Sequence, residues 1–227
     1  MAGNAAVDQS APGVADTQLA RIAADGSRVH DHALHLQAAD GPSAARDLAD
    51  AVHLLCSIYG RHPGMIELAL ATTPAGPIRE WMMGAADAFE RERLFLVRLT
   101  AAVGPLPSTP GAHETEAVLR AQRRAVETLA QSERQGCALG AATALTGDWP
   151  VIRAILDRCA ARVGVDAPES ILPGDDDSAA LIREHIVGPG PERALAFGAE
   201  QLLLQHRGLF DLLEARAGAR DKADGIG

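Results

Sequence analysis

Several residue types that commonly mark a function are scarce in this 227-residue sequence. Aromatic residues make up 3% of the chain, and Lys222 is its only lysine, so arginine carries almost all of the positive charge. The hydrophobic fraction of 47% and the charged fraction of 22% are those of a globular protein and exclude wholesale disorder. The core therefore has to be built from Ala, Leu and Val, side chains that suit closely packed helices.

A concentrated basic surface is also missing. The formal net charge is −9, whereas binding to nucleic-acid phosphates requires clustered basic residues. The nearest approach to a cluster, Arg120, Arg123 and Arg124, has acidic neighbours on both sides. We therefore expect no nucleic-acid partner and, for the same reason, no binding to an anionic membrane surface.

Paired cysteines and long apolar runs are absent too. Cys56, Cys137 and Cys159 are widely spaced and form no Cys-x-x-Cys motif, which argues against a zinc ribbon or a redox pair. No uncharged apolar run reaches the length of a transmembrane helix. The initial stretch MAGNAAVDQSAPGVADTQ lacks the basic start and apolar run of a secretory signal. We therefore expect a cytoplasmic protein.

The motifs of common enzyme classes do not occur. The sequence has no Gly-x-Gly-x-x-Gly, no P-loop, no Gly-x-Ser-x-Gly and no helix-turn-helix with a basic recognition helix. In GPGP, at 188–191, the prolines remove backbone amides that a phosphate would need. The sequence leaves open whether the protein is an enzyme, and it identifies no catalytic residue.

What the sequence does contain is a helical pattern. Apolar residues recur at spacings of three and four between Pro- and Gly-rich loops, and no segment alternates strictly as a strand would. We predict an all-α fold, a roughly antiparallel bundle of six or seven helices. One helix is expected from Pro77 to about Val103 and another from His113 toward Leu145, with TGDWP as a break before the next.

The domain organisation predicted from composition is simple. Residues 1–40, rich in Ala, Gly, Asp and Ser, are expected to form a partly flexible arm. A single helical domain is expected over residues 41–218, and a flexible tail over residues 219–227.

Polar residues inside apolar stripes are the main functional signal. His206 lies at the centre of the leucine stripe in EQLLLQHRGLFDLL, and Glu92 and Glu133 lie within the stripes of two other helices. His53 lies at the edge of a fourth stripe. Such a residue has to be paired, metal-bound or next to a water-filled pocket. His206, Glu92, Glu133 and His53 are therefore candidate metal ligands, and hydrogen bonds or helix–helix ion pairs are the alternative explanation for each.

Glu90 competes with Glu92 for the core-facing position of its helix. Met83, Ala86, Glu90, Leu94, Val97 and Ala101 form a second, mostly apolar stripe. Glu90 and Glu92 are about 200° apart around a helix, so they cannot both face one site. The sequence leaves open which of the two faces the core.

Two resemblances follow from these patterns. In helix number and placement, residues 43–217 resemble the ferritin-like bundles, which implies a transition metal such as iron or manganese. The Glu-x-x-His motif of that family is absent, and Asp50-x-x-His53 is the nearest substitute. The stretch GDWPVIRAILDRCAARVGV, after a long Ala-rich helix, resembles an uncharacterised helical family of alphaproteobacteria, which implies a bacterial origin and no particular activity.

Two functions are consistent with these observations. The first is a helical domain that binds a protein partner or forms a homo-oligomer, which the absence of a catalytic constellation favours. The second is a bundle that holds a metal or a small ligand around the His and Glu residues of its core.

Overall fold

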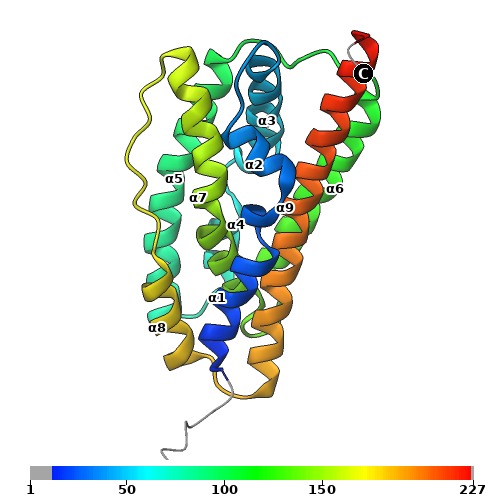
Figure 1. Ribbon diagram of the computed structural model, residues 1–227. Coiled ribbons are helices and arrows are strands. Elements are labelled where there is room, and N and C mark those ends of the chain that lie inside the picture. The colour runs from blue at the N-terminus through cyan, green and yellow to red at the C-terminus, as the bar shows by residue number, and fades with distance from the viewer. Residues whose placement is uncertain (1–11, 226–227) are drawn as a thin grey trace, which may run out of the picture.

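The protein is described by a computed structural model over residues 12–225, and these residues fold into helices joined by short loops (Figure 1). No strand occurs among them, which confirms the all-α prediction. In chain order the elements are α1 (Val14–Asp25), the short 3-10 helix η1 (Ser27–Val29), α2 (Asp31–Gln37), α3 (Ala44–Tyr59), α4 (Met65–Thr72), α5 (Pro77–Ala102), α6 (Ala112–Ala130), α7 (Cys137–Val163), α8 (Asp175–His185) and α9 (Pro189–Ala223). This part of the chain has nine α-helices rather than six or seven. None of them is both long and apolar enough to cross a membrane.

The helices α6 and α7 divide the chain differently from the prediction. A loop at residues 131–136 separates the two helices, and α7 then continues through TGDWP, with Pro150 inside the helix. A proline there removes a backbone hydrogen bond and costs about 3 kcal/mol. Asp148 and Trp149, which precede it, are completely buried. Their tertiary contacts hold the helix through a segment whose local sequence indicates a turn.

The predicted N-terminal arm is part of the core. Ala15 and Ile22 of α1 and Ala33 and Leu36 of α2 are buried, and both helices pack along α7 and α9. Figure 1 shows them in blue in front of these two helices. The prediction of a flexible arm is wrong for residues 14–37, because each short helix buries an apolar face; residues 1–11 lie outside the described part of the chain.

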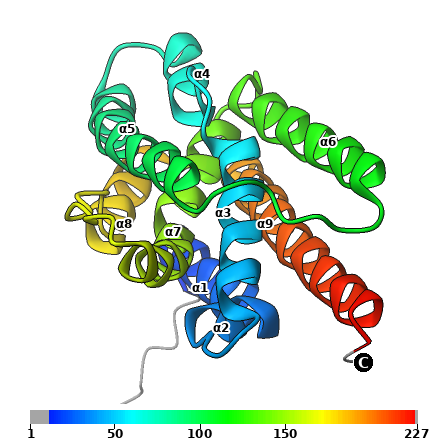
Figure 2. The same cartoon turned by 90° about the horizontal axis from the view of Figure 1, so that it is seen from above.

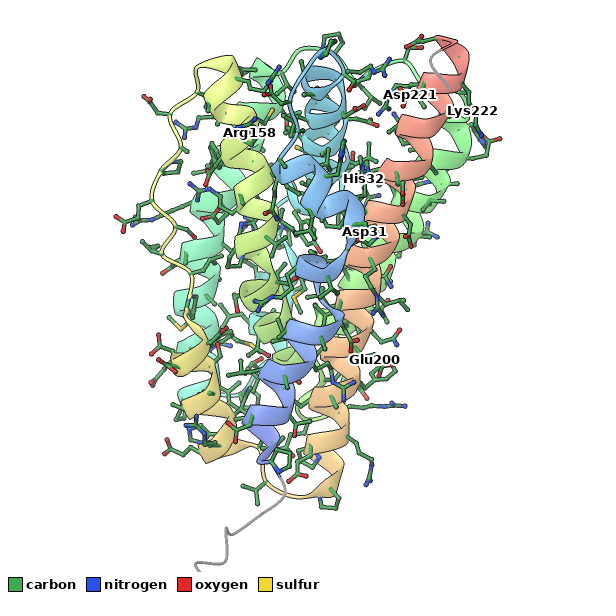
Figure 3. The ribbon with its side chains drawn as sticks, viewed as in Figure 1. Asp31, His32, Arg158, Glu200, Asp221 and Lys222 are labelled. Atoms are coloured by element: carbon green, nitrogen blue, oxygen red, sulfur yellow. The ribbon has the colours of Figure 1, made fainter. Side chains whose placement is uncertain are left out.

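The two ends of the helical domain also differ from the prediction. Arg158, near the upper end of α7 (Figure 3), donates hydrogen bonds to the carbonyl oxygen of Ala39, with Nη2 at 3.0 Å. At the other terminus α9 continues to Ala223, and Arg220 is buried, so residues 219–223 are helical rather than a tail. Residues 226 and 227 lie outside the described part.

The two longest helices, α7 and α9, run in the same direction (Figure 1), because residues 164–174 and α8 return the chain to the end where α7 began. The predicted antiparallel arrangement does not hold for this pair. Where they cross, a Cβ at Gly140 would overlap the carbonyl oxygen of Leu195, and one at Gly198 would overlap that of Cys137. Glycine at these two positions allows the helix backbones to touch, which is how a core poor in aromatics becomes closely packed.

The helix α3 occupies the middle of the bundle, as the view along the long axis shows (Figure 2). It contacts α5, α6, α7 and α9, and it buries residues around most of its circumference. At its C-terminal end, Tyr59 is directed toward α7 and α9 and contacts a residue of each. This is where the polar residues of the core meet.

Candidate functional site

His206 of α9 is buried, with 1% of its surface exposed, and both of its ring nitrogens have partners. Nδ1 lies 2.6 Å from Oδ2 of Asp148 on α7, and Nε2 lies 2.5 Å from the hydroxyl of Tyr59 on α3. With the Nδ1 proton donated to Asp148, Nε2 accepts the hydroxyl hydrogen of Tyr59. No lone pair of the imidazole then remains for a metal ion.

Asp148 links this network to the N-terminal segment. The backbone amide of Ser27 donates to Oδ1 at 2.7 Å, and the hydroxyl of Ser27 donates to Oδ2 at 2.5 Å. A Cβ at Gly26 would overlap Oδ1, so glycine at this position lets the carboxylate approach η1. Burial alone would raise the pKa of Asp148, but the hydrogen bond from His206 and the hydrogen bonds from Ser27 outweigh it and hold that pKa below its ordinary value.

Tyr59, the only tyrosine, is held as a neutral hydrogen-bond donor. Burial raises its pKa, and the negative charge of Asp148 raises it further. Its ring packs edge-on against Trp149, with centroids 5.4 Å apart, and Phe89 lies 4.7 Å from the same indole. Three of the seven aromatic residues are thus gathered around His206, and they shield the network from water.

Glu92 faces the core, and Glu90 does not. Oε2 of Glu92 accepts a hydrogen bond of 3.0 Å from the indole nitrogen of Trp149, and Oε1 lies 2.9 Å from Nη1 of Arg153. The same guanidinium lies over the ring of Phe95 and reaches Asp157 at 2.7 Å. Glu92 is therefore the carboxylate of a buried ion pair.

The structure does not bring the four predicted metal ligands together. Glu133 is exposed in the loop between α6 and α7. His53 is half-buried, and its Nε2 lies 2.8 Å from the carbonyl oxygen of Gly104. Within residues 12–225, no group of three ligand atoms close enough to share an ion includes any of His206, Glu92, Glu133 and His53. Hydrogen-bonded partners account for the burial of His206 and of Glu92 without a metal ion.

Asp50, the predicted substitute for a glutamate ligand, lies elsewhere. It is completely buried at the upper end of the bundle, where it binds Arg216, at 2.8 Å, and Arg220, at 2.5 Å, both from α9. Asp47 also pairs with Arg220. The carboxylate of Asp50 is neutralised by Arg216 and by Arg220, and Arg220 lies in the segment predicted to be a tail.

One group in the described part of the chain does have the composition of a metal site. Ligand atoms of His62, Glu67 and Glu90 lie within 4.8 Å of one another. The buried guanidinium of Arg93 lies among them: it pairs with both carboxylates, and its Nη1 is 3.1 Å from Nδ1 of His62. The cluster already contains its own cation, so its geometry is that of an ion-pair network.

Sequence reasoning found His206 and missed most of its partners. Asp148 lay in TGDWP, the segment predicted to be a break, and Ser27 lay in the predicted arm. The available signal was a lone Asp-Trp pair after an Ala-rich apolar run, CALGAATALTGDW. An unpaired charge in such a run requires a buried partner.

The fold and this polar interior define an all-helical protein with a buried hydrogen-bonded network in its core. A model of a family of unknown function, DUF6975, matches residues 22–221, and the chain belongs to that family. This confirms the resemblance to an uncharacterised helical family. The chain matches no curated protein and no solved structure.

Proposed function

We propose that this protein is a cytoplasmic, bacterial association protein that binds a protein partner through the outer face of α5. The observation that carries the proposal is a row of large apolar side chains exposed on that helix. Met83, Leu94 and Val97 are exposed by 49%, 56% and 44%, respectively. Large apolar side chains in one row on a helix are typical of a helix-binding surface.

The spacing along α5 supports a helical partner. Met83, Asp87, Glu90, Leu94 and Val97 follow one another at intervals of four and three, the spacing of a coiled-coil seam. The two carboxylates between Met83 and Leu94 divide the apolar surface, so the strongest contact is expected around Leu94 and Val97. Arg91 and Arg98 lie on the solvent-exposed surface beside these two residues and supply the polar rim that such interfaces have.

Substitution of Leu94 by Asp tests this proposal. Full burial of a leucine contributes about 1.5–3 kcal/mol, so the variant is expected to bind its partner at least about tenfold more weakly. The matched control is Val187→Asp, which places the same charge at an exposed apolar residue outside α5. Binding is measured with a photo-crosslinker at Val97 in an extract of the source cells, and self-association by light scattering.

The outcome distinguishes a specific surface from a chance one. A crosslinked species of defined mass that Leu94→Asp removes and Val187→Asp retains supports the proposal. Equal crosslinking in all three proteins, or none in any of them together with a monomer by light scattering, contradicts it.

A further inference from the structure

A groove of about 790 Å³ opens at the end of the bundle where α5, α7 and α9 begin, the lower end in Figure 1. Its walls are the loop at 72–77, the loop at 131–136 and the end of α8. Ile78, Met82 and Leu139 supply apolar surface, and Glu133, Arg134 and His185 supply charge or hydrogen bonds. A volume between about 300 and 1,000 Å³ is typical of sites for small molecules.

A second, more open hollow lies next to the groove, along the same loop. It shares Arg134 with the first and adds Arg193 and Phe197. The guanidinium of Arg134 lies over the ring of Phe197, 5.7 Å from its centroid. In the part of the chain that the structure describes, neither Arg134 nor Arg193 lies within 4.0 Å of a carboxylate, whereas ten of the other eighteen arginines do.

We propose that the groove binds a small organic anion, with its apolar body on Ile78, Met82 and Leu139 and its carboxylate or phosphate head at Arg134. An unpaired guanidinium at the edge of apolar surface is complementary to an amphipathic anion. The carboxylate of Glu133, next to Arg134, repels the negatively charged head group and therefore lowers the affinity. The groove is separate from the outer face of α5, since Met83, Leu94 and Val97 do not line it.

The probe for this site is 8-anilinonaphthalene-1-sulfonate, an organic anion whose fluorescence rises in apolar surroundings. We expect saturable binding to the full chain in the micromolar range and competition by decanoate and decyl phosphate, which separates the two head groups. Decanol has the same apolar body without the charge. We expect it to compete about tenfold less well, because it lacks a charged hydrogen bond to Arg134.

Four variants locate the site. Arg134→Ala is expected to weaken binding about tenfold, and Glu133→Gln to strengthen it a few-fold. Arg124→Ala, at an exposed arginine of α6 outside the groove, is the matched control and leaves binding unchanged. Ala75→Trp fills the groove from an exposed loop position and is expected to abolish binding, provided that its circular dichroism and Tm match the wild type.

Two results would overturn the inference. One is that binding of the probe does not saturate below about 1 mM, because an affinity that weak does not indicate a specific site. The other is wild-type affinity in a folded Ala75→Trp protein, which would place the binding elsewhere. A tighter Glu133→Gln protein together with a weaker Arg134→Ala protein supports it, because an apolar site without charge recognition would respond to neither.

Discussion

Replacement of His206 by alanine tests whether the buried network stabilises the fold. The variant leaves Asp148 with only its bonds from Ser27 and leaves the hydroxyl of Tyr59 without its partner. The substitution removes a hydrogen-bond partner from the buried charge of Asp148, and an uncompensated buried charge costs about 3–5 kcal/mol. At about 2–4 °C per kcal/mol for a chain of this length, we expect Tm to fall by about 6–20 °C.

The assay is urea unfolding followed by far-UV circular dichroism, with a double-mutant cycle through Asp148→Asn. Because the two side chains bond directly, their effects are expected to be non-additive by about 1–3 kcal/mol. His53→Ala is the control and is expected to cost about 1 kcal/mol, since His53 is half-buried and makes one hydrogen bond. A loss below about 1 kcal/mol in His206→Ala, or simple additivity in the cycle, would refute a structural role for the network.

Three further predictions follow from the same contacts. Because the pKa of Tyr59 is raised above 10.0 in the folded protein, the contribution of Tyr59 to folding stability is present below pH 10.0 and is lost as the pH rises further. In an alkaline titration, phenolate absorbance should therefore appear only together with unfolding. Ionisation of Tyr59 before unfolding would contradict its burial. Because the pKa of Asp148 is lowered from 3.8, its contribution is present above that pH and is lost as the pH falls further; in acid denaturation followed by circular dichroism, Asp148→Asn should flatten this step. Gly198→Ala should lower stability by about 1–3 kcal/mol or more, whereas Gly84→Ala, on the open face of α5, should raise it by about 0.5–1 kcal/mol in the same urea assay.

Periodicity predicted the long helices best. The helix from Pro77 ends at Ala102, one residue from the predicted boundary, and the leucine stripe around His206 lies in α9 as expected. It failed where local and tertiary preferences conflict. TGDWP has the residues of a turn, and only the burial of Asp148 and Trp149 against other helices makes it helical. Those contacts come from distant parts of the chain, so no local stretch of sequence reveals them.

Composition failed at the N-terminus for a similar reason. Residues 14–37 are rich in Ala, Asp and His, and each helix there is too short to be stable alone. Both are stabilised by packing against α7 and α9 and by Ser27, whose two hydrogen bonds reach Asp148, 121 residues away. A stripe shows that a residue faces the core, but the partner it meets there depends on the packing of the whole chain.

The positions of these partners decide where the function of this protein has to be sought. His206, Asp148 and Tyr59 lie in a row that resembles a catalytic arrangement, but each is at most 4% exposed and each is bonded to the next. The network joins α3, α7, α9 and the N-terminal segment, so substitutions there are expected to change stability, whereas the two surfaces proposed for recognition, the outer face of α5 and the groove beside Arg134, lie outside it.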